Sequence, residues 1–356
     1  MTQPDVTVVT VTYNASALVL DCLASLRAQR LGDVTMDVVV VDNASSDGTA
    51  DLVEARAPWV RVLRARENLG FAGGNDLALR DVTSRYVLLV NNDATLEADT
   101  VRTLVEAMDR AAPDVAAMSP TVLLAEHFRA AAPTDTRGVV TGPDGRWTPD
   151  PDGDVRLVNS TGNEVRTDGY GVDRGWLAQA AQHRPPRDVF GFTGAAALLR
   201  TAALRQVGLF DETFFMYYED TDLSWRLRLA GWRVEHCPGA VVEHVHSASS
   251  VEGSAFFRFH DTRNRLATLT KCAPAGLVVR AVARDVVTTV SILVRRTRPA
   301  EHARTRLRAL SSYAMMLPAL LAERRRIGRT AAVRRRDVAA HLVPVAAAYG
   351  PYRDAG

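Results

Sequence analysis

Lysine and cysteine are among the scarcest residues in this chain of 356 residues. Its three cysteines, Cys22, Cys237 and Cys272, lack the spacing of metal ligands, and an odd, sparse set is typical of a reducing compartment. We therefore expect a cytoplasmic protein whose thiols are small core residues. Lys271 is the single lysine, and the sequence contains neither a G-x-x-x-x-G-K-S/T loop nor a G-x-G-x-x-G pattern. These absences disfavour P-loop kinases and dinucleotide-dependent hydride carriers.

Long uncharged apolar runs are also missing. The most apolar segment, residues 277–294, is interrupted by two arginines and an aspartate, and charges in mid-membrane are costly, so a membrane-spanning helix is disfavoured. Residues 276–356 contain 16 arginines and 5 acidic residues, whereas the rest of the chain contains 27 basic and 36 acidic residues. We expect residues 271–356 to form basic, amphipathic helices that lie on the body or on an anionic membrane surface. The alternative is a basic face that meets only solvent.

Apolar runs alternate with helical patterns four times near the start of the chain. Runs typical of buried strands are followed by segments with helical spacing, and such alternation predicts an α/β protein with a parallel, doubly wound sheet. The predicted strands are residues 6–12, 38–41, 60–64 and 87–90. Residues 67–75 are rich in glycine, and we expect a loop there whose backbone N–H groups approach a nucleotide.

The second half is less regular. Residues 124–187 show little periodicity and many Gly, Pro and Asp residues, and we interpret them as a lid or acceptor loop because long loops are usually functional or disordered. Periodicity then predicts one strand over residues 189–200, a short helix over 201–207 and a helix over 219–229. The acidic first turn of that last helix suits the helix dipole. In the C-terminal region we expect helices over residues 277–294, 306–326 and 334–348.

Acidic residues follow three apolar strands: Asp42, Asp93 and the pair Glu219 and Asp220. The carboxyl ends of the strands in a doubly wound sheet converge at one crevice, where ligands bind. There Asp42 could accept hydrogen bonds from a base or ribose, and Asp93 could hold a divalent metal against phosphate oxygens. Each acid alone could equally be a turn-forming residue.

A series of ordered blocks resembles the family 2 glycosyltransferases of the GT-A fold, in the rhamnosyltransferase-like branch. The resemblance extends from about residue 6 to residue 266. The blocks are residues 11–14, 41–48, 68–75, 91–93, 191–195, 208–212, 218–223 and 244–249, and residues 158–163 also resemble that branch.

The resemblance implies an organisation for the whole chain. Its fold is a doubly wound, mixed and mostly parallel sheet in residues 1–270, followed by a helical appendage. The implied parts of the sheet domain are a nucleotide-sugar-binding half, an acceptor or lid insertion, and an acceptor and catalytic half. Their expected bounds are residues 1–122, 123–188 and 189–270.

Catalytic and metal-binding roles are implied by the same resemblance. Asp220 matches the catalytic base, which takes the proton of the attacking acceptor hydroxyl, and Glu219 is a second-choice base. Asp93 matches the last acid of the D-x-D metal element, whose first acid is replaced by Asn91 in this chain. His244 matches the histidine near the metal and the diphosphate, with His246 as an ambiguous neighbour.

Ligand-binding roles complete the implied site. Some residues match positions that border the nucleotide, and others match positions on the acceptor side. The first set comprises Thr12, Tyr13, Asn14, Asp42, Asn68, Gly70, Gly73, Asn75 and Asn92. The second set comprises Phe192, Thr193, Gly194 and Asp222, although Asp222 could instead be a second-choice base or simply a charge that suits the helix N-terminus.

The implied activity is inverting transfer of a sugar, with Mg²⁺ or Mn²⁺ as cofactor. The expected donor is dTDP-rhamnose, and the expected acceptor is a glycan or lipid-linked glycan at the inner face of the cell membrane, in cell-wall or polysaccharide biosynthesis. We expect no nucleic-acid partner. A galactofuranosyl or other hexosyl transferase and a non-catalytic nucleotide-sugar-binding subunit remain alternatives, the latter because of Asn91. A nucleotidyltransferase is disfavoured because residues 12–14 stand where it has a glycine- and lysine-rich start.

Overall fold

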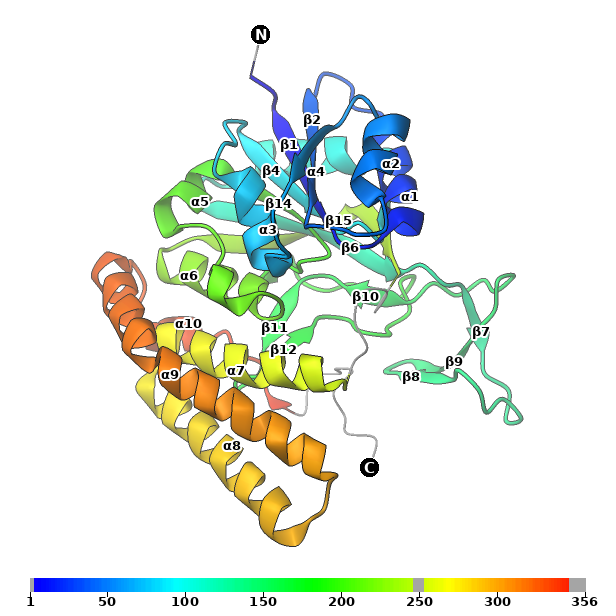
Figure 1. Ribbon diagram of the computed structural model, residues 1–356. Coiled ribbons are helices and arrows are strands. Elements are labelled where there is room, and N and C mark those ends of the chain that lie inside the picture. The colour runs from blue at the N-terminus through cyan, green and yellow to red at the C-terminus, as the bar shows by residue number, and fades with distance from the viewer. Residues whose placement is uncertain (1–2, 246–252, 346–356) are drawn as a thin grey trace.

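The computed structural model describes residues 3–245 and 253–345, which form a central sheet with helices on both faces and a helical block at one side (Figure 1). β1 pairs in parallel with both β2 and β4, and β2 pairs in parallel with β3, so the predicted doubly wound start is confirmed. The bounds of these strands are β1 (Val6–Thr12), β2 (Met36–Asp42), β3 (Arg61–Arg64) and β4 (Tyr86–Val90).

Helices cover both faces of the sheet, which is why its strands are apolar on both sides. Alternate side chains of a strand point to opposite faces, so Val8 packs into one core and Val9 into the other. One face is covered by α1 (Ser16–Arg27), α2 (Thr49–Arg56) and α4 (Thr100–Arg110), and the other by α3 (Gly70–Leu79), α5 (Thr201–Val207) and α6 (Glu219–Leu229).

The other half of the sheet is mixed in direction. The strand order is β13-β15-β6-β14-β4-β1-β2-β3, with β10 and β5 added beside β6 and β15. β14 runs antiparallel to both of its neighbours, and β15 runs parallel to β6. The bounds are β5 (Ala94–Leu96), β6 (Val115–Leu124), β10 (Val158–Ser160), β13 (Asp188–Val189), β14 (Ala196–Arg200) and β15 (Arg233–His244).

The prediction of a single strand over residues 189–200 is wrong, because this stretch forms two strands, β13 and β14. The chain leaves β13 at the edge of the sheet, crosses over residues 190–195 and enters β14 at its centre. The crossing segment is held by Asn163, whose backbone N–H donates to the Gly191 carbonyl at 2.7 Å and whose carbonyl accepts from the Gly191 N–H at 2.9 Å. These bonds replace the ladder that a continuous strand would have formed.

The prediction of a glycine-rich loop over residues 67–75 is also wrong, because α3 already begins at Gly70. The glycines serve close packing. Gly70 has a φ of +69°, and a Cβ there would collide with the carbonyl oxygen of Phe215. A Cβ at Gly74 would lie 2.7 Å from Cγ1 of Val11, so glycine lets α3 approach β1 closely.

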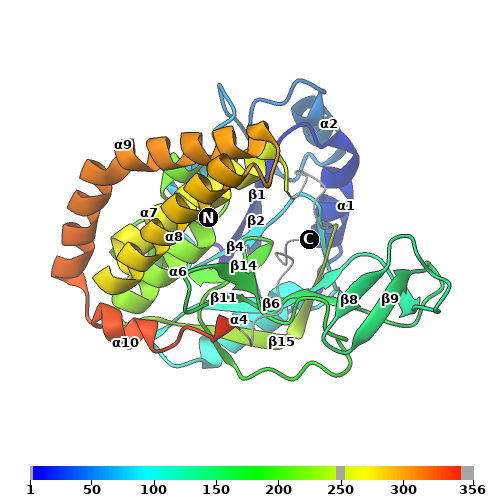
Figure 2. The ribbon, with the colours of Figure 1, turned by 90° about the horizontal axis from the view of Figure 1, so that it is seen from below.

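Residues 124–187 contain several short strands instead of one structureless loop. A separate three-stranded sheet with the order β7-β9-β8 extends to one side of the body (Figure 2). β10 joins the main sheet beside β6, and β11 pairs with β12. The bounds are β7 (Phe128–Ala130), β8 (Val140–Gly142), β9 (Gly145–Pro149), β11 (Asn163–Val165) and β12 (Gly171–Asp173).

The C-terminal region is helical, as predicted. α7 (Ala255–Cys272), α8 (Ala275–Arg295) and α9 (Ala300–Thr330) pack side by side next to α6 (Figures 1 and 2). The third predicted helix is only α10 (Arg335–Ala339), and the end of its predicted range lies outside the described residues. Within the described part of the chain, none of the helices is long and apolar enough to cross a membrane. The three cysteines are free and buried, as expected.

Candidate active site

The carboxyl ends of β1, β2 and β4 meet at one edge of the sheet and bring three predicted segments together. Thr12 and Asp42 are register partners at the ends of β1 and β2. Nδ2 of Asn92, just after β4, donates to Oγ1 of Thr12 at 3.3 Å. The predicted convergence of Thr12, Asp42 and the segment of residues 91–93 is therefore what the parallel register produces.

Asp42 is buried and only half satisfied. Its Oδ2 accepts a hydrogen bond from the Ser45 N–H at 3.2 Å, whereas its Oδ1 is buried without a hydrogen-bond partner. A buried carboxylate oxygen without a donor costs free energy. A ligand N–H or O–H group would remove that cost, so the geometry fits a role for Asp42 in binding a base or ribose.

Tyr13 and Asn14 border this edge in different ways. The ring of Tyr13 is 49% exposed, so it offers a surface on which a base could stack. Asn14 has a φ of +47°, and its Oδ1 accepts a hydrogen bond from the Ser46 N–H at 2.8 Å. Asn14 thus anchors the loop that follows Asp42.

The backbone amides of residues 69, 70 and 72 are already engaged within the protein, so these three N–H groups are not free for a nucleotide. The Leu69 N–H donates to Oδ1 of Asn43 at 2.9 Å, and the Gly70 N–H donates to Oδ1 of Asn68 at 2.9 Å. The Ala72 N–H donates to the Phe215 carbonyl at 3.2 Å. Asn68 and Gly70 therefore form hydrogen bonds within the protein at the start of α3.

Gly73 and Asn75 likewise serve the packing of α3. A Cβ at Gly73 would lie 2.9 Å from Cβ of Leu69, and the buried Asn75 donates from Nδ2 to the Phe71 carbonyl at 2.9 Å. Asn43, which was not among the predicted site residues, organises the corner: its Nδ2 donates to Oδ1 of Asn68 at 3.0 Å and to the Gly70 carbonyl at 2.9 Å. The signal for Asn43 was its place directly after Asp42.

Asp93 and His244 lie together although 150 residues separate them in the chain. β15 pairs with β5, so that His244 is opposite Ala94, and Nε2 of His244 lies 3.1 Å from Oδ1 of Asp93. Both side chains are largely buried, and this Asp93 oxygen makes no hydrogen bond. His246 lies outside the described residues.

The donor set of this pair suits a divalent cation. A carboxylate oxygen without a hydrogen-bond donor next to an imidazole nitrogen offers two ligands, and Mg²⁺ characteristically completes its shell with water and substrate phosphates. Residues 3–245 and 253–345 contain no group of three or more His, Cys, Asp or Glu side chains arranged around one metal position. The residues present therefore fit a cation shared with a diphosphate better than a metal held by protein alone.

Asn159 was not predicted to belong to the site, yet it reaches His244. Its Oδ1 lies 2.7 Å from Nδ1 of His244, and Nδ2 of Asn91 lies 3.4 Å from Nε2 of the same ring. Both contacts are satisfied when Nδ1 carries the proton and Nε2 accepts. The signal for Asn159 was its place in residues 158–163, a block of the family resemblance.

Asp220 and Glu219 open α6 on the other side of the site. Oδ2 of Asp220 accepts from the Gly194 N–H at 3.0 Å, and its Oδ1 accepts from the Thr221 N–H at 2.5 Å. Burial raises the pKa of Asp220, and burial together with the neighbouring Asp220 charge raises the pKa of Glu219 well above its usual range. Oε2 of Glu219 is buried without a hydrogen-bond partner.

The crossing segment links the two acidic positions. The Gly194 N–H binds Asp220, and the carbonyl of the next residue, Ala195, accepts from the Asn91 N–H at 2.9 Å. A Cβ at Gly194 would lie 3.6 Å from Oδ2 of Asp220, so glycine leaves space beside that carboxylate. The structure thus brings Asp220, Gly194 and the segment containing Asp93 into one site.

Two residues predicted for the acceptor side are placed in the protein interior instead. Phe192 is completely buried in the core beneath α5 and α6. Asp222 is also completely buried, and it forms ion pairs with Nε of Arg226 at 2.8 Å and with Nζ of Lys271 at 2.9 Å. Neither side chain is available to an acceptor, whereas Thr193, which is also largely buried, adjoins Gly194.

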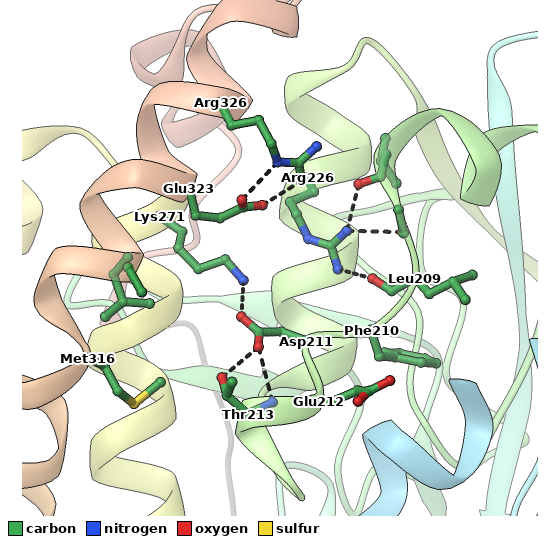
Figure 3. Close-up of a pocket in the computed structure, with 14 residues that line it drawn as sticks. Leu209, Phe210, Asp211, Glu212, Thr213, Arg226, Lys271, Met316, Glu323 and Arg326 are labelled. Carbon is green, nitrogen blue, oxygen red and sulfur yellow. Dashed lines mark hydrogen bonds and ion pairs between the residues drawn. The ribbon is translucent and has the colours of Figure 1, made fainter. Parts of the chain in front are cut away.

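A separate pocket of about 530 Å³ lies between residues 207–213 and α9 (Figure 3). Two of its cationic side chains are engaged within the protein: Nζ of Lys271 binds Oδ2 of Asp211 at 2.7 Å, and Arg226 donates to the Leu209 carbonyl at 2.7 Å. The residues that line it do not include those predicted for the active site. This pocket is a seam between the sheet domain and the C-terminal helices.

Comparison with known proteins agrees with the geometry. A family model described as glycosyl transferase family 2 matches residues 7–137, and one described as glycosyl transferase family group 2 matches residues 162–265. The N-acetylglucosaminyl-diphospho-decaprenol L-rhamnosyltransferase of Mycobacterium tuberculosis is 29% identical over 257 residues, which cover 68% of this chain and 76% of the relative.

Solved structures share the fold at low identity. The mannosyltransferase PcManGT from Pyrobaculum calidifontis, in complex with GDP-Man and Mn²⁺, superposes with a TM-score of 0.50 at 19% identity, covering 93% of this chain and 86% of that one. GalNAc-T7 with UDP, GalNAc and Mn²⁺ superposes with a TM-score of 0.58 at 11% identity, covering 89% and 57%.

The fold, the site and these similarities define the class: the chain belongs to the family 2 glycosyltransferases and has the GT-A fold. Within that class it is rhamnosyltransferase-like, because its match to the mycobacterial rhamnosyltransferase extends over most of both chains.

Proposed function

We propose that this enzyme transfers a rhamnosyl group, with inversion, from dTDP-rhamnose to a lipid-linked glycan in cell-wall or polysaccharide biosynthesis. One observation carries the reaction type: the two-residue segment of Gly194 and Ala195 joins Asp220 to the strand end that bears Asp93. This arrangement supports a reaction in which Asp220 is the base and Asp93 lies at the diphosphate. The choice of sugar and acceptor is supported by the similarity to the mycobacterial rhamnosyltransferase.

In this proposal Asp220 takes the proton of the acceptor hydroxyl as its oxygen attacks the anomeric carbon. The bond from that carbon to the diphosphate breaks on the opposite face, and the nucleoside diphosphate leaves with the electron pair. Burial raises the pKa of Asp220, which makes its carboxylate a stronger base. The Gly194 N–H and the Thr221 N–H fix both of its oxygens, so the base is positioned before substrate binds.

Asp93 and His244 would hold Mg²⁺ or Mn²⁺ at the diphosphate. The cation would stabilise negative charge on the leaving group. Asp42, with its buried Oδ1, and the exposed ring of Tyr13 would hold the nucleoside. Thr12 and Asn92 support this edge by hydrogen-bonding to each other.

The acceptor would reach the site from the membrane side, with residues 271–356 making peripheral contact at the inner face of the membrane. An acceptor linked to a lipid requires such proximity, and the arginines of this region suit an anionic surface.

The test is a thermal-shift panel of dTDP, UDP and GDP and their sugars with Mg²⁺ or Mn²⁺, followed by transfer assays with the donors that bind. A native-state ligand raises stability by mass action, so dTDP-rhamnose should give the largest shift. A larger shift and faster transfer with another nucleotide sugar would reassign the donor. Asn91 also leaves a non-catalytic subunit as an alternative, and transfer or donor hydrolysis above background by the purified protein would exclude it.

A further inference from the structure

Helix α8 exposes its most apolar face to solvent. Its buried face consists of Leu277, Ala281, Asp285, Thr289 and Ile292, and so includes a carboxylate and a hydroxyl. On the opposite side, six large apolar side chains are between 45% and 76% exposed, and we call them the valine face. The valine face consists of Val279, Val286, Val287, Val290, Leu293 and Val294.

This distribution is the reverse of the usual pattern for a surface helix. Residues three, four and seven apart in a helix share one side, so the six side chains form a continuous stripe along α8. Scattered exposed apolar residues are ordinary, but a contiguous patch marks an interaction surface. α8 lies at the outer edge of the helical block, away from the central sheet (Figure 1).

The helix cannot rotate to hide the valine face, because buried ion pairs fix its orientation. Asp285 on the inner side forms ion pairs with Arg265 of α7 and with Nη2 of Arg306 of α9, the latter at 2.7 Å. Nε of Arg306 also donates to Oγ1 of Thr289 at 3.1 Å. Turning α8 would break the ion pair between Asp285 and the completely buried Arg265, and such a loss is strongly unfavourable.

Exposed arginines continue directly from the end of the valine face. Arg295, Arg296 and Arg298 lie at the turn from α8 to α9, next to Leu293 and Val294, and we call them the arginine turn. Arg304 and Arg308 are exposed on the first turns of α9, and Glu301 is the exposed acidic residue beside them. The charge at the turn between α8 and α9 is therefore strongly positive.

We infer that the valine face and the arginine turn form a docking surface for an anionic lipid bilayer. The apolar stripe lies in the interface between headgroups and acyl chains, and the arginines contact anionic headgroups, as in interfacial amphipathic helices. The charge of the arginine turn favours an anionic membrane over a second copy of this chain, whose own arginine turn would repel it. The inference rests on the peripheral membrane contact in the proposed function and names the surface that makes it, whereas the vesicle test requires neither donor nor lipid-linked acceptor.

The test is flotation of the full-length protein with vesicles of phosphatidylcholine alone or mixed with phosphatidylglycerol, without donor or acceptor. Flotation should occur with the anionic vesicles and weaken as salt is raised. The double substitution Val287→Glu and Val290→Glu should reduce vesicle affinity at least about tenfold, because it places two charges in the interface. Thr288→Glu, at an exposed position between them on another side of the helix, is the matched control and should cost much less.

A second set of substitutions tests the charge. Arg295→Gln and Arg296→Gln together should weaken the preference for anionic vesicles while leaving thermal unfolding unchanged, because these side chains are exposed. Absence of flotation by the native protein would overturn the inference. So would equal flotation of the Val287→Glu, Val290→Glu protein and the Thr288→Glu control. A dimer in gel filtration that dissociates only in the Val287→Glu, Val290→Glu protein would instead assign the face to a second copy of the chain.

Discussion

Oδ1 of Asn159 lies 2.7 Å from Nδ1 of His244, and this contact connects the β10 segment to the candidate metal position. The ring nitrogens of histidine are distinguished by the hydrogen bond that each one makes. Here the Nδ1 proton is held by Asn159, so the lone pair of Nε2 is directed toward Asp93. Asn159 thus acts as a positioning residue for His244.

Replacing Asn159 tests that role. Asn159→Leu should remove the acceptor and mix the two tautomers of His244, whereas Asn159→Asp should preserve the Nδ1–H form. Nitrogen chemical shifts of labelled histidine report the tautomer directly in the ligand-free protein. We expect Mn²⁺ affinity, measured by electron paramagnetic resonance, to fall about 10- to 100-fold in Asn159→Leu only. Unchanged shifts in Asn159→Leu would show that Asn159 does not set the tautomer.

Asp220→Asn should reduce transfer by about 100- to 10,000-fold, because the amide cannot accept the acceptor's proton. Donor binding should survive, since in the proposed mechanism Asp220 acts on the acceptor hydroxyl, whereas Asp42 and Asp93 hold the donor. The measurement pairs initial rates with a thermal shift by dTDP-rhamnose. Near-native turnover in a variant that still binds donor would remove Asp220 from the role of base.

Asp222→Ala should act on stability instead of chemistry. Its removal leaves Lys271 and Arg226 buried with fewer counter-charges, at an expected loss of about 3–5 kcal/mol in unfolding free energy. Urea denaturation measures the loss. Asp21→Ala, at an exposed position on α1, is the control and should change stability by no more than about 0.5 kcal/mol. A stable Asp222→Ala protein with no activity would return Asp222 to the acceptor side.

Glu219→Gln should stabilise the fold at neutral pH. The folded-state pKa of Glu219 is raised above its unfolded value, so its stabilising contribution is present at low pH and is lost as pH rises through the folded-state pKa. Removing the carboxyl group should therefore raise the melting temperature near pH 7 and have little effect near about pH 4. Glu67→Gln, at an exposed position, should show neither effect. A Glu219→Gln protein that is less stable at neutral pH would contradict the sign.

Gly70→Ala and Gly48→Ala separate backbone strain from crowding. Both glycines have positive φ, but a Cβ at Gly48 meets no atom within 4 Å, whereas a Cβ at Gly70 collides with the Phe215 carbonyl. Gly70→Ala should therefore cost about 1–3 kcal/mol more than Gly48→Ala in unfolding free energy. Equal losses in chemical denaturation would mean that the α3 corner can shift to admit a methyl group.

The sheet could be predicted from the sequence because its signal is local. Continuous or alternating apolar residues in β1, β2 and β4 report burial on both faces, and acids at strand ends locate the crevice. The start of α3 could not be predicted in this way. Its glycines indicate a loop when considered alone, and the need for them arises from contacts made in the folded chain, such as that of Gly70 with Phe215 and that of Gly74 with Val11.

Side-chain direction in the site was equally hidden. In the sequence Phe192 is close to Gly194, and Asp222 is close to Asp220. The local backbone turns Phe192 and Asp222 inward and leaves Gly194 and Asp220 at the site. Asn159 lies 85 residues from His244 in a stretch with little periodicity, so their contact depends on β10 joining the sheet.

The ion pairs of Asp285 have a consequence for how the molecule unfolds. Arg265 on α7 and Arg306 on α9 share this carboxylate, and the core beneath them continues from Trp225 of α6 to Ile327 of α9. α6, which begins with Glu219 and Asp220, is therefore part of the same cooperative unit as the C-terminal helices. A chain ending before α8 would lose the side chains of α8 and α9 that pack against Trp225 and its neighbours. The basic C-terminal region therefore supports the structure around the transferase site.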